Sequence, residues 1–291
     1  MPRGRDAAGG GPAAGSERRD RGRRVFTEVM TYAPPDGPAP AVTDGLIDLV
    51  FADIWSRPGL SRRDRRFVTL PCVAAADDEA SLVDHVHAAL NSDDIGITEM
   101  REAVLHFAVY GGWPNASRLN AVVNEQWARI HRERGLAVPA PEPLLPLTTA
   151  SKPELRLEGG ERAFREINCL PDAPSRDNPY SGAGILNFVF GEMWLRPGLS
   201  RRERRLITLA CVAIQGASMP IDAHVYGALR SGDVSCDEMD EVALHFAAYY
   251  GWPKASRLSQ ATSEQKRRIT RESGALAAAQ DNAVPRSQAT A

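Results

Sequence analysis

The sequence predicts an all-α protein built from two tandem copies of one helical unit, related by approximate two-fold symmetry. The chain has 291 residues, and about half of the residues over 45–119 are identical to those over 184–258. Equivalent residues are separated by 139 positions; the pairs include Arg57 and Arg196, His85 and His224, and His106 and His245. Apolar residues recur at helical spacing in both copies, and no segment alternates as a strand would.

Each predicted helix has a recognisable start or end. In the first copy a Pro-Gly pair interrupts the chain, and Ser61 with Asp64 forms the S-x-x-acid pattern that begins a helix. The third helix should stop at the run Gly-Gly-Trp-Pro that starts at Gly111. The expected helices run through 67–73, around 85–90, over 99–110 and from 115 to about 134, with the same four in the second copy.

Composition shifts divide the chain into five segments. The expected segments are a disordered tail over 1–24, a first domain over 25–138, a Pro-rich linker over 139–158, a second domain over 159–272 and a disordered tail over 273–291. The first tail is rich in Gly, Ala and Arg and has little apolar surface to bury.

Composition also limits the partners, cellular location and cofactors expected of the protein. The chain is 43% apolar and 25% charged with a net charge of −2, so no strong field is expected to attract nucleic acid or an anionic membrane. No signal peptide or membrane span is evident, and a cytoplasmic location is expected. The four cysteines form no C-x-x-C pair or Cys/His cluster, so neither a metal nor a cofactor is predicted, and the cysteines are interpreted as incidental residues.

Candidate catalytic residues recur in both copies. Each copy places a glutamate, a histidine and a tyrosine four residues apart, so that each trio lies on one helix face. The trios are Glu102, His106 and Tyr110, and Glu241, His245 and Tyr249. A carboxylate one turn away can orient an imidazole and raise its pKa, which suits proton transfer near neutral pH. His85 and His224, on the preceding helix, are expected to face the same cavity.

Further candidates would contact a substrate. Arg57 and Arg196 precede the first helix of each copy and are candidate clamps for a substrate carboxylate. The other candidates are His87, Tyr110, Trp113, Tyr226, Tyr249 and Trp252.

Each candidate also has a structural interpretation. The Glu/His pairs are equally consistent with simple hydrogen bonds, and the two helix histidines with satisfied core residues. Arg57 and Arg196 could instead cap a carbonyl group or pair with Asp64 and Glu203. The arginines over 62–66 are interpreted as a solvated or subunit-facing side of the helix.

The copies resemble the carboxymuconolactone decarboxylase family, which includes the AhpD-like alkylhydroperoxidases. The resemblance rests on RPGLSRRDRR followed by VTL, then H-x-x-A-A-L, then E-x-x-x-H-x-A-x-Y-x-G-x-P, found twice at the same separations. It implies an all-helical fold and ring-like assembly, here most simply a homotrimer of fused pairs.

The resemblance implies two chemistries that use different residues. Peroxidatic relatives have a C-x-x-C pair ending four residues before the helix histidine, whereas this chain has Asp78 with Ser81 and Ala217 with Pro220. No dithiol peroxidase activity is therefore expected. The decarboxylase branch typically has a glutamate four residues before that histidine and an arginine two residues after it. These positions hold Ser81 and His87 in one copy, and Pro220 and Tyr226 in the other.

The leading hypothesis is a cofactor-independent lyase that acts on a small carboxylated or enolisable substrate by acid–base chemistry. The alternatives are an isomerase or cyclase for a bulkier metabolite, and a non-catalytic oligomeric binding module. The two cavities should differ in size and charge, since Asp84 corresponds to Ala223, and Gly111 to Tyr250. The first copy is favoured as the active one, because it adds the titratable groups of His87 and Asp84 and because Gly111 should leave a roomier pocket.

Overall fold

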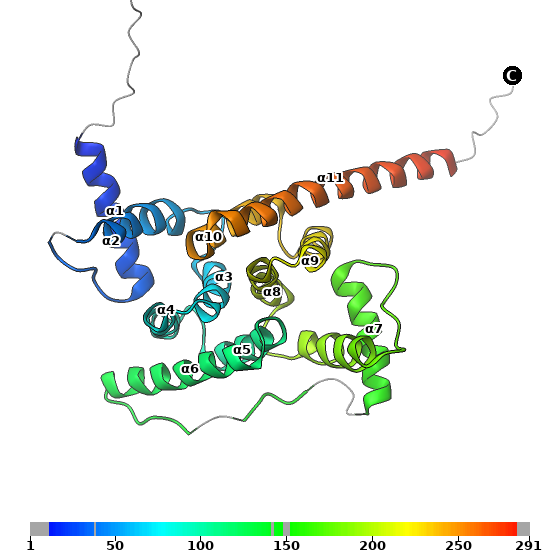
Figure 1. Ribbon diagram of the computed structural model, residues 1–291, viewed down its shortest axis with the longest axis horizontal. Coiled ribbons are helices and arrows are strands. Elements are labelled where there is room, and N and C mark those ends of the chain that lie inside the picture. The colour runs from blue at the N-terminus through cyan, green and yellow to red at the C-terminus, as the bar shows by residue number, and fades with distance from the viewer. Residues whose placement is uncertain (1–11, 38, 141–142, 148–151, 284–291) are drawn as a thin grey trace, which may run out of the picture.

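The computed structural model describes residues 12–37, 39–140, 143–147 and 152–283, and within these residues it is helical and contains no strand (Figure 1). The first repeat comprises α1 (Pro12–Met30), α2 (Ala41–Gly45), the π-helix η1 (Leu46–Trp55), α3 (Arg62–Ala75), α4 (Glu79–Asn91), α5 (Ile97–Gly111) and α6 (Trp113–Glu133). The second comprises α7 (Pro153–Asn168), the π-helix η2 (Tyr180–Phe190), the 3₁₀ turn η3 (Met193–Leu195), α8 (Arg201–Gln215), α9 (Ser218–Ser231), α10 (Cys236–Tyr250) and α11 (Trp252–Ala283). The all-α prediction is confirmed.

The predicted helix boundaries follow from local chemistry. The Ser61 hydroxyl accepts a hydrogen bond from the backbone N–H of Asp64 at 3.0 Å, and the Asp64 carboxylate accepts one from the backbone N–H of Ser61, which completes a capping box at the start of α3. The equivalent box starts α8. Gly112 ends α5 with a φ of +84°, in the left-handed region where a side chain would be strained.

The prediction of a disordered N-terminal tail is wrong for residues 12–24, which form most of α1. Arg19 binds Asp48 at 2.5 Å, and Arg18 binds Asp53, so the basic residues of the supposed tail pair with acidic residues of η1. Phe26 packs edge-on against Phe51 in a small apolar cluster. Helix α1 is therefore an integral part of the first repeat.

Helix α7 is the counterpart of α1 in the second repeat, and it sits against η2 as α1 sits against η1. Gly22 and Gly160 lie directly against the backbone carbonyls of Ile47 and Leu186, respectively, which leaves no room for a side chain. The helices also extend beyond two expected boundaries: 153–158 belong to α7 rather than to the linker, and 273–283 continue α11. The rest of the expected tails, 1–11 and 284–291, lies outside the described residues.

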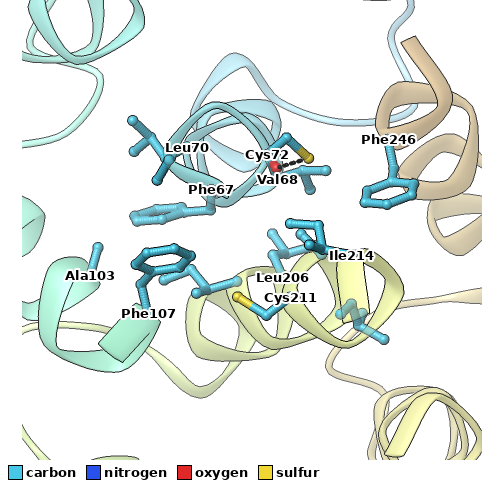
Figure 2. Close-up of a cluster of buried hydrophobic side chains, with 14 of the residues drawn as sticks. Phe67, Val68, Leu70, Cys72, Ala103, Phe107, Leu206, Cys211, Ile214 and Phe246 are labelled. Atoms are coloured by element: carbon cyan, nitrogen blue, oxygen red, sulfur yellow. Dashed lines mark hydrogen bonds between the residues drawn. The ribbon is translucent and has the colours of Figure 1, made fainter. Parts of the chain in front are cut away.

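The core runs without interruption through both repeats. Helices α3 and α8 lie side by side at the centre (Figure 1). Helix α3 also contacts α10 of the second repeat, and α8 contacts α5 of the first. Figure 2 shows Phe67 of α3 next to Phe107 of α5, with Leu206 and Cys211 of α8 on the facing side. The two repeats thus share one apolar core, with approximate two-fold symmetry between them.

The arginines of α3 differ from the expectation of a solvated side. Arg62 is exposed and Arg63 binds Glu203 of the other repeat at 2.7 Å, but Arg65 and Arg66 are fully buried. Arg204 and Arg205 are their buried equivalents in α8. Burying a guanidinium group requires hydrogen-bonding partners, and here carboxylates and backbone carbonyls supply them for part of each group.

Candidate active site

The histidines of α5 and α10 bind the opposite repeat. His106 Nε2 lies 2.9 Å from Thr208 Oγ1, and His245 Nε2 lies 2.8 Å from Thr69 Oγ1. Both rings are fully buried, and burial and nearby arginines hold the pKa of each well below its ordinary value. These imidazoles are neutral at physiological pH and connect the repeats.

The glutamates do not orient these histidines, which corrects the expected Glu/His relay. Both carboxylate oxygens of Glu102 are bound by Arg196, at 2.8 and 2.7 Å, in a buried bidentate pair between the repeats. Glu241 accepts from Arg57 at 2.7 Å and from Arg65 at 3.1 Å. Arg57 and Arg196 therefore hold the repeats together. Neither is among the residues that line the cavities beside His224 and His85, where a carboxylate clamp was expected.

His224 and His85, which line the two cavities described below, each contact a tyrosine of the other repeat. His224 of α9 lies edge-on to Tyr110 of α5, with 5.6 Å between ring centroids, and His85 lies 5.2 Å from Tyr249 in the same way. Trp194 Nε1 donates to the Tyr110 hydroxyl at 2.8 Å, as Trp55 does to Tyr249 at 2.7 Å. Each of the two sites is thus composite, whereas the sequence suggested one site inside each copy.

The larger cavity, about 520 Å³, lies beside His224. Tyr110 comes from the first repeat, while Phe164, Ile185 and Phe190 of α7 and η2 form much of the apolar wall. Asn168 and Gln215 supply uncharged amides. No acidic side chain is among the described residues that line it.

His224 is held as a neutral ring. Burial, together with the charge of Arg205, lowers the pKa of His224 to about 3. Arg205 Nη1 lies 3.3 Å from Nδ1, and a guanidinium group can only donate, so Nδ1 is the acceptor and the ring hydrogen lies on Nε2. His224 is therefore a hydrogen-bond donor beside a largely apolar cavity.

The second cavity, about 310 Å³, lies beside His85. Its walls come from equivalent elements, but Asp78, Ser81 and Asp84 line it where the other cavity has Ala217, Pro220 and Ala223. The prediction that the cavities differ in charge is confirmed, and the expectation that the first is roomier is wrong. Gly111 and Tyr250 line neither cavity: Gly111 packs against Phe107, and Tyr250 against Phe246.

Four expected substrate contacts lie outside both cavities. His87 is buried near Gln126, and the Tyr226 hydroxyl donates to Glu272 of α11 at 2.8 Å. Trp113 and Trp252, at the starts of α6 and α11, are both exposed. Tyr110 and Tyr249 are the expected contacts that the structure places in the cavities.

The roles of Trp194, Arg205, Asn168 and Gln215 at this site were not predicted from the sequence. A signal for the first two was present, because Trp55 and Arg66 occupy the equivalent positions of the first copy. The amides carried no such signal, since the first repeat has Met30 and Ala76 at the equivalent places in its cavity.

Two features are absent from the described residues. No group of three or more His, Cys, Asp or Glu side chains there is arranged to hold a metal ion. Within the same residues, no helix combines the length and apolar character needed to cross a membrane.

Comparison with known proteins identifies the repeated unit. The model of the carboxymuconolactone decarboxylase family matches residues 40–125 and again 179–264. A 72-residue stretch, 25% of this chain, is 36% identical to 4-carboxymuconolactone decarboxylase of Acinetobacter baylyi and covers 53% of it. A 69-residue stretch, 24% of this chain, is 39% identical to nitrosuccinic acid decarboxylase npaB of Metarhizium robertsii and covers 48% of it.

The matched stretches span about half the length of these curated relatives. The two matches to the family model, in contrast, cover more than half of the present chain and coincide with the two structural repeats. The chain therefore belongs to the carboxymuconolactone decarboxylase family, as a member that carries the family's helical unit twice.

Proposed function

We propose that the protein is a cofactor-independent lyase that decarboxylates a small unsaturated or keto acid in the cavity beside His224. The observation that carries the proposal is a neutral, buried histidine that shares this cavity with a tyrosine of the other repeat. Both relatives described above are named as decarboxylases, which supports a decarboxylase-like activity.

The proposed role of His224 is to stabilise negative charge. When the bond to the carboxylate breaks, its electron pair moves into an adjacent carbonyl, directly or through an alkene conjugated with that carbonyl, and CO₂ leaves. The Nε2–H of a neutral imidazole donates to the oxygen on which charge develops, and an apolar, water-poor cavity strengthens this interaction. This replaces the general-acid role expected from the sequence, because a pKa of about 3 leaves almost no imidazolium at neutral pH.

Tyr110 is the proposed donor of the proton that replaces CO₂. Burial raises the pKa of Tyr110 to about 12, so its hydroxyl stays protonated at neutral pH. Because Trp194 donates to the tyrosine oxygen, the phenolate formed after proton transfer keeps a hydrogen bond.

The residues that line the cavity beside His224 indicate the class of substrate. Aromatic and aliphatic side chains surround most of the cavity, and Asn168 and Gln215 can bind a carboxylate or carbonyl without adding charge. The volume of about 520 Å³ also accommodates a bulkier molecule, which keeps an isomerase or cyclase as the second candidate. That reaction would use the same proton transfer without releasing CO₂.

A panel of β-keto and β,γ-unsaturated carboxylates tests the proposal. Incubation in D₂O should release CO₂ and place one deuterium at the carbon that loses the carboxylate or at its vinylogous position, as seen by NMR. His224→Ala should abolish both signals, whereas His131→Ala on α6, away from both cavities, should retain them. Deuterium exchange without CO₂ would favour the isomerase. Neither signal from any acid, with ligand binding retained, would favour the non-catalytic binding module.

A further inference from the structure

A row of buried polar side chains leads from Tyr110, the proposed proton donor, into the interface between the repeats. Tyr110 lies one helical turn after His106 on α5, with 5.5 Å between the ring centroids. His106 Nε2 lies 2.9 Å from Thr208 Oγ1, and His106 Nδ1 lies 3.5 Å from Nη1 of Arg204. Thr208 and Arg204 are one turn apart on α8, and both are buried, as His106 is.

Arg204 fixes the direction of the hydrogen bonds along this row. A guanidinium group can only donate, so Nδ1 of His106 is the acceptor and the hydrogen of the neutral ring is assigned to Nε2. That hydrogen points at Thr208 Oγ1, which therefore accepts from His106. A hydroxyl group can accept and donate at once, and its hydrogen rotates to suit the acceptor. Thr208 can thus donate to a further group while His106 holds its oxygen.

Tyr110 is the group at the end of this row. Burial raises the pKa of Tyr110 to about 12, and hydrogen bonds with Trp194 and Thr208 oppose that rise. Both hydrogen bonds therefore favour the phenolate over the neutral tyrosine. Trp194 Nε1 is one donor to the tyrosine oxygen, at 2.8 Å, and the Thr208 hydroxyl is placed to be the other. A hydrogen bond donated to a charged oxygen is about twice as strong as one between neutral groups.

Arg204 also supplies a positive charge behind His106. Burial lowers the pKa of Arg204 to about 10, so the group is still protonated at neutral pH. It lies 3.8 Å from Glu102, both of whose oxygens are bound by Arg196. Its equivalent in the first repeat, Arg65, pairs more closely with a glutamate, at 3.1 Å. The charge of Arg204 is thus less completely balanced, and it polarises the row toward negative charge on the tyrosine oxygen.

We propose that Thr208 is a positioning residue of the reaction: its hydroxyl, oriented by His106, donates to the phenolate that Tyr110 becomes. The inference rests on the function proposed above, in which the tyrosine protonates the carbon that loses CO₂. In that step the tyrosine O–H bond breaks, a C–H bond forms, and the negative charge passes from the substrate to the tyrosine oxygen. The phenolate recovers its proton from water that enters as the product leaves.

Turnover of Thr208→Val, which keeps the shape of threonine and removes the hydroxyl, tests this role. On the acid that the CO₂ assay identifies, kcat should fall by about tenfold or more while KM changes by less than about twofold, because Thr208 acts through the tyrosine and not on the substrate. Thr208→Ser, which keeps a hydroxyl, should recover most of the loss.

The first repeat offers a matched control. Thr69 makes the equivalent hydrogen bond with His245, at 2.8 Å. Thr69→Val therefore removes a buried hydrogen bond of the same kind, and it should lower stability as Thr208→Val does. It should leave kcat nearly unchanged. Equal losses of kcat in the two valine variants would show a structural effect and overturn the inference.

A titration without substrate separates this inference from the proposed function. Fluorine makes a phenol more acidic, so 3,5-difluorotyrosine incorporated in place of Tyr110 forms its phenolate at an accessible pH, which ¹⁹F NMR detects. Thr208→Val should move the midpoint to higher pH by about one unit or more, whereas Thr208→Ser should leave it nearly unchanged. An unmoved midpoint, or full turnover by folded Thr208→Val, would overturn the inference and leave the proposed function intact. Full turnover by Tyr110→Phe would overturn the proposed function, and this inference with it.

Discussion

Mild acid should destabilise this fold before its carboxylates titrate. His85, His106, His224 and His245 are buried, and burial lowers the pKa of each below its ordinary value of 6.5. The unfolded chain therefore takes up protons that the folded protein does not. The stabilisation from neutral burial is complete above pH 6.5 and is lost as the pH falls from there toward the pKa values of the folded state.

The magnitude follows from linkage. At about pH 5.5 the four histidines together should have reduced the free energy of unfolding by roughly 5–6 kcal/mol relative to pH 8. That loss is comparable to the whole stability of many domains, about 5–15 kcal/mol. Carboxylates such as Glu241, whose pKa is lowered mainly by its hydrogen bond to Arg57, contribute only nearer pH 4 and below.

Urea denaturation followed by circular dichroism, at about pH 8, 6.5 and 5.5 and constant ionic strength, measures this dependence. A variant, His106→Gln, removes one titrating group and should reduce the slope between pH 6.5 and 5.5 by about a quarter. A free energy of unfolding that is constant from pH 8 to 5.5 would refute the reasoning, as would a variant slope equal to that of the natural protein.

Four other outcomes are expected. Glu102→Ala should destabilise the protein by about 3–5 kcal/mol, because it leaves buried guanidinium groups unpaired. Glu133→Ala removes one partner of an exposed ion pair and should leave urea stability almost unchanged, so equal effects of the two variants would contradict the prediction. Gly160→Ala should destabilise the protein by roughly 1–3 kcal/mol or more, because the added methyl group meets the Leu186 carbonyl. Gly159→Ala, whose methyl group would meet only the flexible end of Arg162 at 3.9 Å, should be neutral or stabilising in thermal melts, and the reverse order of the two variants would contradict this. Peroxide consumption with a dithiol reductant should be undetectable, since both repeats lack the cysteine pair, and any turnover above background would disprove it. Light scattering should report a trimer at micromolar concentration; a monomer would exclude the expected assembly.

Much of the fold is predictable because its signals are local. These signals are the capping residues, the glycines that follow α5 and α10, and the helical periodicity, each of which acts within a few residues. Because the unit is duplicated, each signal occurs twice in the chain. The prediction of a disordered tail fails over 12–24, the start of α1, for a physical reason. An arginine-rich, weakly apolar segment resembles a disordered tail until the aspartates of α2 and η1, some 25–35 residues later, neutralise it.

The candidate site was predicted in part. His85 and His224 do line cavities, and each faces a tyrosine of the kind expected, but the tyrosine comes from the other repeat. Spacing along one helix shows which side chains share a face, and it cannot show that the face packs on a helix more than 100 residues away. For the same reason the glutamates seemed to serve the histidines of their own helix, although their partners are arginines across the interface.

The central claim, that the reaction occurs at a cavity shared by the two repeats beside His224, is tested most directly by turnover of two matched variant pairs. On the acid that the CO₂ assay identifies, His224→Ala and Tyr110→Phe should each lower kcat by about 100-fold or more, and their combination should lose less than the product of the single losses, because the two groups act on one substrate. His85→Ala and Tyr249→Phe, the equivalent changes at the other cavity, should retain most of the activity. A larger loss from the His85 and Tyr249 variants, or full activity in the folded Tyr110 variant, would contradict the account.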